Sequence, residues 1–92
     1  MGRASKHKPE RLAAKLLQIR LAFGLSQNEM ISRLGLSDEI LQASISGYEL
    51  GTRIPPLTVL LRYAEVAGIC TDTLINDKLN LPAKLPSKPK HR

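Results

Sequence analysis

The chain has 92 residues, a formal net charge of +6 and 42% hydrophobic residues, with two Tyr, one Phe and no Trp. A chain of this length folds as one small domain, which argues against an enzyme built around a large cleft. Because the apolar residues are mainly aliphatic, we expect short packed helices rather than a β-sandwich or barrel.

The cysteine content and the length of the apolar runs indicate in which compartment the protein is expected. Cys70 is the only cysteine, which excludes an internal disulfide and a zinc site built from several cysteines. We therefore expect a cytoplasmic protein with a quiet, partly buried thiol. No apolar run approaches the roughly 20 residues that span a bilayer, so no membrane association is expected.

The basic residues concentrate at the two ends of the chain. Residues 1–9 contain three basic and no acidic residues, residues 79–92 four basic and no acidic residues, and residues 10–78 seven basic and eight acidic ones. This pattern predicts a flexible basic arm over 1–9, a nearly neutral folded domain over 10–78 and a basic, Pro-rich tail over 79–92. Beyond Asn80 the apolar content is too low to predict packing. Basic tails bind phosphates without reading sequence, so charge alone is weak support for specific recognition.

Each of the first two predicted helices is followed by a glycine. Apolar residues at helical spacing predict a first helix from about Glu10 to Phe23, followed by Gly24. Ser26 begins a second helix with a capping box, since its hydroxyl can accept the amide of Glu29 while the Glu29 carboxylate accepts the Ser26 amide. Gly35 ends this second helix. The polar face of the first helix is expected to carry Arg11, Lys15, Gln18 and Arg20.

Three further helices are predicted after a less regular stretch. Between Leu36 and Ser44 the polar residues Ser37, Asp38 and Glu39 indicate a turn or a short helical start, and a third helix then stops at Gly51. A fourth helix runs through Ala67 and can open at Pro56, because proline is tolerated in the first helical turn. A short fifth helix follows, capped by Thr71 or Asp72.

Two short helices joined by a Gly-containing turn form the layout in which a second helix can enter the DNA major groove. The segments Leu25–Met30, Leu34–Ser37 and Ile45–Gly51, followed by Pro55, Leu60 and Ala64, form an ordered series. With their spacing, they resemble the Cro/repressor-type (XRE) helix-turn-helix family over roughly Leu12 to Ile75. The resemblance implies an all-α, compact five-helix, lambda-repressor-like domain with the helix-turn-helix at its second and third helices.

The chain departs from the family pattern in one place. Seven residues separate Ser37 from Ile45, where the family usually has about three. About four extra residues therefore lie in the turn or at the start of the recognition helix, which the resemblance places at about 42–50.

The resemblance implies base contacts from the recognition helix. A glutamine can pair with adenine N6 and N7, a serine can bond to several base edges, and an alanine can touch a thymine methyl group. The alternative is that Gln42 and Ser44 only cap and solvate the helix. The implied base-contacting residues are Gln42, Ala43, Ser44, Ser46 and Gly47.

Gly47 is unusual because a glycine inside a helix costs on the order of 1 kcal/mol relative to alanine. Two explanations are open. The missing side chain can let the helix backbone approach a base or sugar closely, or it can relieve crowding against the second helix.

The resemblance also implies phosphate contacts and one ion pair. The phosphate contacts come from Gln27, at the start of the second helix, and from Thr52 and Arg53 in the loop after the third helix. The alternative for Gln27 is that it is an ordinary residue of the first helical turn. The alternative for Thr52 and Arg53 is that their side chains are only solvated. An ion pair between Arg20 and Glu49 would tie the recognition helix to the first helix, which is a scaffold role.

These features predict sequence-specific binding of double-stranded DNA by a transcriptional regulator of the repressor type. One short helix reads few base pairs, so a homodimer is expected, with Ile69 to Leu81 as the candidate contact. The alternative is a protein-interaction module, such as an antitoxin that holds a partner toxin, with DNA binding secondary. The nearly neutral folded domain keeps this alternative open.

Catalysis is not expected. The chain has no Gly-rich phosphate loop and no clustered carboxylates in a predicted cleft. His7 and His91 have no partner ligand in helical register, so neither a metal site nor a cofactor is expected.

Overall fold

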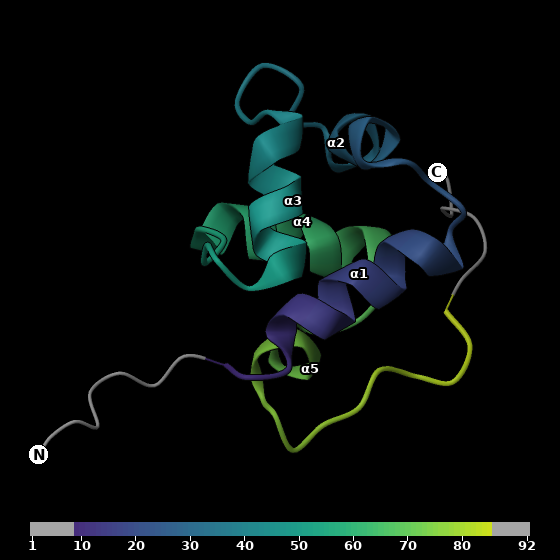
Figure 1. The fold of residues 1–92 in the computed structure, drawn as a ribbon. Helices are drawn as coiled ribbons and strands as arrows, with labels where there is room; N and C mark the ends of the chain where they lie inside the picture. Colours follow the sequence, from purple (N-terminus) through teal and green to yellow (C-terminus); the bar gives the residue numbers. More distant parts are fainter. Residues whose placement is uncertain (1–8, 86–92) are drawn as a thin grey trace, which may run out of the picture.

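Five helices follow one another in the computed structural model, which describes residues 9–85 (Figure 1). No strand occurs within this range, and the predicted all-α, five-helix fold is confirmed. The predictions for most of the N-terminal arm and for the end of the tail lie outside the described residues. The helices are α1 (Leu12–Ala22), α2 (Gln27–Leu34), α3 (Gln42–Leu50), α4 (Leu57–Ala67) and α5 (Thr71–Ile75).

Local signals set both ends of α2. The Ser26 hydroxyl accepts the Glu29 amide at 3.0 Å, and the Glu29 carboxylate accepts the Ser26 amide at 2.7 Å. Gly35 follows the helix with a φ of 74°, a left-handed conformation that glycine adopts without a Cβ clash. The predicted capping box and the predicted stop are therefore both present.

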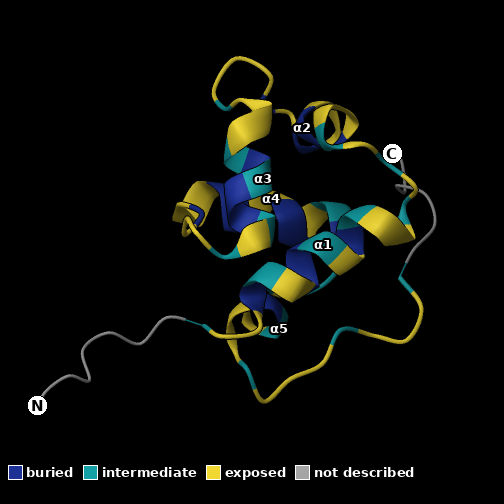
Figure 2. Cartoon of the chain, in the orientation of Figure 1, coloured by how far each residue is buried: buried dark blue, intermediate teal, exposed yellow. Residues whose placement is uncertain are grey.

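The apolar sides of the helices meet in one core. Figure 2 shows the buried residues on the inner faces of α1, α3 and α4. α3 packs against α1 and α2, and α5 packs against α1 and α4. The largest fully buried side chains are Leu16, Ile19, Met30, Leu34, Ile45, Tyr63 and Leu74.

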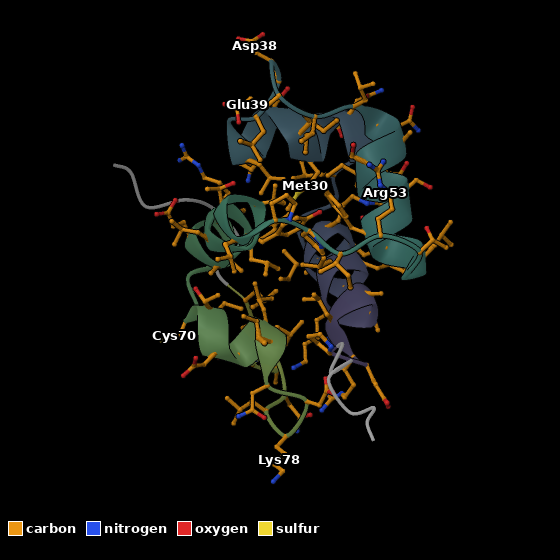
Figure 3. All side chains as sticks on the ribbon, turned by 90° about the vertical axis from the view of Figure 1, so that its left-hand side faces the viewer. Met30, Asp38, Glu39, Arg53, Cys70 and Lys78 are labelled. Atoms are coloured by element: carbon orange, nitrogen blue, oxygen red, sulfur yellow. The ribbon has the colours of Figure 1, made fainter. Side chains whose placement is uncertain are left out.

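The inserted residues form a turn between α2 and α3. The carbonyl of Leu36, a buried residue, accepts the amides of Glu39 at 2.9 Å and Ile40 at 3.1 Å. Asp38 and Glu39 lie at the outer end of this turn (Figure 3). The extra residues therefore lengthen the turn, and α3 begins at Gln42 and ends at Leu50.

α1 begins at Leu12, later than predicted, and part of its polar face is buried. Only 2% of Lys15 is exposed, and its ammonium donates to the carbonyls of Thr73 at 2.7 Å and Asn76 at 3.0 Å. The expectation that Lys15 faces solvent is wrong because α5 packs over it. Burial, and to a lesser extent the charge of Arg11, lower the pKa of Lys15.

The segment after α5 folds back over the N-terminus of α1. The Asp77 carboxylate accepts the amides of Glu10 and Arg11, each at 3.0 Å. The Arg11 guanidinium donates to the Asp77 carbonyl at 2.7 Å and to Asn80 Oδ1 at 2.6 Å. These contacts, together with those of Lys15, are called the terminal clasp below. The clasp supplies the two amides that precede α1 with acceptors from a distant part of the chain.

Three predictions for the C-terminal part are wrong. Cys70, rather than Thr71 or Asp72, is the N-cap residue of α5; it makes no side-chain capping bond and is exposed rather than partly buried. Leu81 and Leu85, in the tail that was not expected to pack, are partly buried against the core.

α4 also starts slightly differently from its prediction. Pro56 is the N-cap residue, and Leu57 is the first helical residue. Within residues 9–85, no helix has the length and apolar character needed to cross a membrane.

Candidate nucleic-acid interface

One side of α3 is buried and the other faces solvent. Ile45 and Tyr48 pack into the core. The start of α3, beside the turn that follows α2, is exposed and lies on the outside of the molecule (Figure 2). Among the predicted base contacts, Gln42 and Ala43 are exposed, Ser44 and Ser46 are partly exposed, and Gly47 is buried.

A chain of hydrogen bonds runs from α1 to Glu49 near the end of α3, and from there through α2 to the first residue of α3. Arg20 Nε donates to Glu49 Oε2 at 2.7 Å, and Arg20 Nη2 donates to Glu49 Oε1 at 3.0 Å. Gln27 Nε2 donates to the same Oε1 at 3.0 Å, and Gln27 Oε1 accepts Gln42 Nε2 at 3.0 Å. We call these four side chains the glutamine relay. The relay connects the buried ion pair to the exposed end of α3.

The carboxylate of Glu49 fixes the orientation of both amides in the relay. An ionised carboxylate only accepts hydrogen bonds, so Gln27 must turn its NH2 group towards it. The Gln27 oxygen then faces Gln42, which must donate in turn. Gln42 is left with one N–H and its own amide oxygen for a ligand. One donor beside one acceptor is the pattern that complements adenine N7 and N6 in the major groove.

The ion pair at the start of the relay is shielded from solvent. The side chains of Arg20 and Glu49 are 15% and 5% exposed. Arg20 Nη1 also donates to the Leu25 carbonyl at 2.8 Å. The hydrogen bonds to Glu49 raise the pKa of Arg20, although burial opposes the shift. The predicted tie between α1 and α3 is therefore present as a bidentate, partly desolvated pair.

A tyrosine hydroxyl lies buried near this pair. Tyr63 is fully buried, and its hydroxyl finds no hydrogen-bond partner among the described residues. Burial, followed by the negative charge of Glu49, raises the pKa of Tyr63. Tyr63 therefore serves as a neutral core residue.

The loop after α3 folds back onto Gly47. The Gly47 carbonyl accepts the amides of Thr52 at 3.0 Å and Arg53 at 3.2 Å. A Cβ placed on Gly47 would lie 2.5 Å from Arg53 Cδ and 2.8 Å from Arg53 Cγ. The crowding relieved by this glycine is thus with the Arg53 stem and not with α2, which corrects the structural explanation offered above. Thr52 and Arg53 are both exposed.

Sequence reasoning missed the bond between Gln27 and Gln42. Both residues had been singled out, but for separate roles on phosphate and base. Their positions at the first residues of α2 and α3 were a usable signal, because two helix N-termini meet at one side of a helix-turn-helix. The lengthened turn hid the register between them. Within residues 9–85, no three potential ligands from His, Cys, Asp and Glu gather into a metal site.

Comparison with known protein families matches residues 16–74 to the helix-turn-helix family. The matched range covers more than half of the chain, from the middle of α1 into α5, and includes the whole α2–α3 pair. Neither the search of curated proteins nor the search of solved structures returned a match. The chain therefore belongs to the XRE-type helix-turn-helix family of DNA-binding transcription regulators.

Proposed function

We propose that this protein is a sequence-specific repressor that inserts α3 into the major groove of its operator. The observation that carries the proposal is the oriented amide of Gln42. It lies at the exposed start of α3, and the relay leaves it with one donor and one acceptor. A side chain held in this way loses little freedom when it pairs with a base, which favours recognition over solvation.

Other exposed groups on α3 extend the proposed reading surface. Ala43 offers a methyl group to a thymine methyl, and Ser44 and Ser46 offer hydroxyls to base edges. The small size of these side chains supports close approach of the helix to the bases. The proposed base contacts remain Gln42, Ala43, Ser44 and Ser46, with Gly47 beneath them.

Phosphate contacts would fix the orientation of the helix. Ser26 already caps the amide of Glu29, whereas the amides of Gln27 and Asn28 have no acceptor among the described residues. Free amides at a helix N-terminus suit a phosphate group. On the other side of α3, Thr52 would bond to the neighbouring phosphate. Such contacts give affinity and register without reading sequence.

We propose further that the protein binds as a two-fold homodimer. One α3 presents only a few side chains, which read too few base pairs to select a site in a genome. Within the candidate contact from Ile69 to Leu81, Leu74 is used by the core, whereas Ile75 and Leu79 are 37% and 40% exposed. These two residues are the better candidates for the dimer contact.

The proposal is tested by selecting bound duplexes from a random DNA pool at near-physiological salt. The selection uses the whole chain and a version without residues 1–8 and 86–92, which keeps the terminal clasp and both packed leucines of the tail. Both should recover the same two-fold symmetric consensus, and the whole chain should show the steeper salt dependence. Absence of any consensus would contradict the proposal. Co-purification of a partner protein with the same chain would then support the interaction module instead.

A further inference from the structure

We propose that Arg53 reads a guanine in the major groove and that Gly47 is the residue that positions it. The inference rests on the proposed function, because it needs α3 to lie in the groove. It differs from that function in one respect, since the arginine of the loop was expected to clamp a phosphate.

Gly47 provides a slot for the stem of Arg53. Three consecutive carbons of this side chain, Cβ, Cγ and Cδ, lie 3.3, 2.8 and 2.5 Å from the position that a Cβ of residue 47 would occupy. Gly47 has no positive φ, so helical geometry does not require a glycine there. The missing side chain is therefore explained by the arginine that lies across it. Any larger residue would displace the stem.

The head of Arg53 is free although its stem is held. Every other arginine within residues 9–85 has a partner, whereas no described residue bonds or pairs with the Arg53 guanidinium. Arg20 pairs with Glu49, Arg11 bonds to the residues of the terminal clasp, Arg62 lies 3.6 Å from Glu65 and Arg33 lies over the ring of Phe23. The five N–H donors of the Arg53 guanidinium thus have no acceptor among the described residues.

The direction of the side chain favours a base over a phosphate. Figure 3 shows Arg53 running back along α3, towards the half of the helix that carries Gln42. A stem held against the helix takes its charge into the groove with α3, whereas a phosphate clamp must reach outwards to the groove wall. Ala43, one turn before Gly47 on the same face, is too short to cover the guanidinium. Two parallel N–H donors match guanine O6 and N7.

The test uses the selected consensus operator and three variants of the whole chain. Arg53→Ala removes the guanidinium with all its donors, and Gly47→Ala fills the slot. Arg62→Ala is the matched control, because it makes the same change at an exposed arginine of α4. Arg53→Ala and Gly47→Ala should each lose preference for one guanine, with roughly ten-fold or more weaker binding to the operator. Replacing that guanine with 7-deazaguanine should weaken binding by the wild type and leave binding by Arg53→Ala unchanged.

A double-mutant cycle separates positioning from packing. If Gly47 acts through the arginine, Gly47→Ala should have no further effect on DNA binding in the Arg53→Ala background. Melting curves should show that Gly47→Ala folds at least as well as the wild type, since alanine favours helix more than glycine. An unchanged consensus in Arg53→Ala would overturn this inference and leave the proposed function intact. Failure of the wild type to select any sequence would overturn both.

Discussion

Two polar networks join distant parts of this chain, and they end differently. The terminal clasp ends in backbone groups, because Lys15 and Arg11 donate to carbonyls and Asp77 accepts amides. The glutamine relay ends in an exposed amide, that of Gln42. The hydrogen-bond partners of the clasp all belong to the protein itself. The relay, in contrast, leaves one donor and one acceptor of Gln42 for a ligand. The terminal clasp therefore stabilises the fold, whereas the glutamine relay can also bind a ligand.

The largest effect should follow from breaking the relay at its buried end. Glu49→Ala leaves Arg20 unpaired in a shielded site, so the free energy of unfolding should fall by about 3 to 5 kcal/mol. Thermal or urea unfolding measures this loss. The control is Glu65→Ala, which removes the exposed pair with Arg62 and should cost less than about 1 kcal/mol. A melting curve of Glu49→Ala that matched that of the wild type would show that the ion pair does not stabilise the fold.

The exposed end of the relay should affect binding rather than folding. Gln42→Ala should lose about 1 to 3 kcal/mol of discrimination at one adenine of the operator. Its stability should stay within about 0.5 kcal/mol of the wild type, because the side chain is exposed. Binding is measured on the operator and on a variant with that adenine replaced.

The matched control is Gln18→Ala, an exposed glutamine on α1. A relay also predicts that Gln27→Ala and Gln42→Ala are not additive, since each removes the bond that orients the other. Additive losses would mean that the two glutamines act independently on DNA.

The clasp should show the opposite behaviour. Lys15→Met replaces a buried ammonium with an apolar side chain of similar length and leaves the carbonyls of Thr73 and Asn76 without their donor. Loss of the donor to these two carbonyls lowers the free energy of unfolding, and burial of the apolar side chain offsets part of this loss. The net decrease should be roughly 1 kcal/mol. Operator affinity per folded molecule should not change. The control is Lys78→Met, at an exposed lysine, which should change neither the stability nor the operator affinity. A loss of DNA specificity in Lys15→Met would contradict a purely structural role of the terminal clasp.

The smallest effect concerns pH. The amides of Glu10 and Arg11 donate to Asp77 and lower the pKa of its carboxyl. A carboxyl whose pKa is lower in the folded state stabilises the fold above its unfolded pKa, and this contribution disappears as pH falls through the folded value. Asp77→Asn should therefore be less stable than the wild type at neutral pH, with the difference shrinking below about pH 4. Melting temperatures across this range measure it. Asp72→Asn removes the same charge without a contact to α1, and an equal pH dependence in that variant would contradict the role of Asp77.

The helices could be predicted because their signals are local. The capping box at Ser26 and Glu29 and the glycine stop at Gly35 depend on neighbours in sequence, and both are present in the fold. The ion pair of Arg20 with Glu49 came from the family resemblance. The burial of Lys15 could not be predicted, because only the packing of α5 covers that face of α1.

The residues of the candidate site could be proposed from the sequence, whereas the contacts between them could not be predicted. Gln27 and Gln42 were both chosen, but the turn between α2 and α3 is longer than the family pattern, so spacing could not show that they meet. The partner of Gly47 depended on the path of the following loop, which brings Arg53 back over α3. In both cases the missing information was the course of an irregular segment, for which sequence periodicity gives no rule.

The terminal clasp also bears on the order in which the molecule folds. The bond between the Arg11 amide and Asp77 spans 66 residues. Closing so long a loop costs chain entropy, whereas the contacts of α2 with α3 involve near neighbours in sequence. We expect the helix-turn-helix to form first and the clasp to close last. In hydrogen exchange, the amides of Glu10 and Arg11 would then open while α3 stays protected, so the helix proposed to bind DNA would stay folded when the chain ends fray.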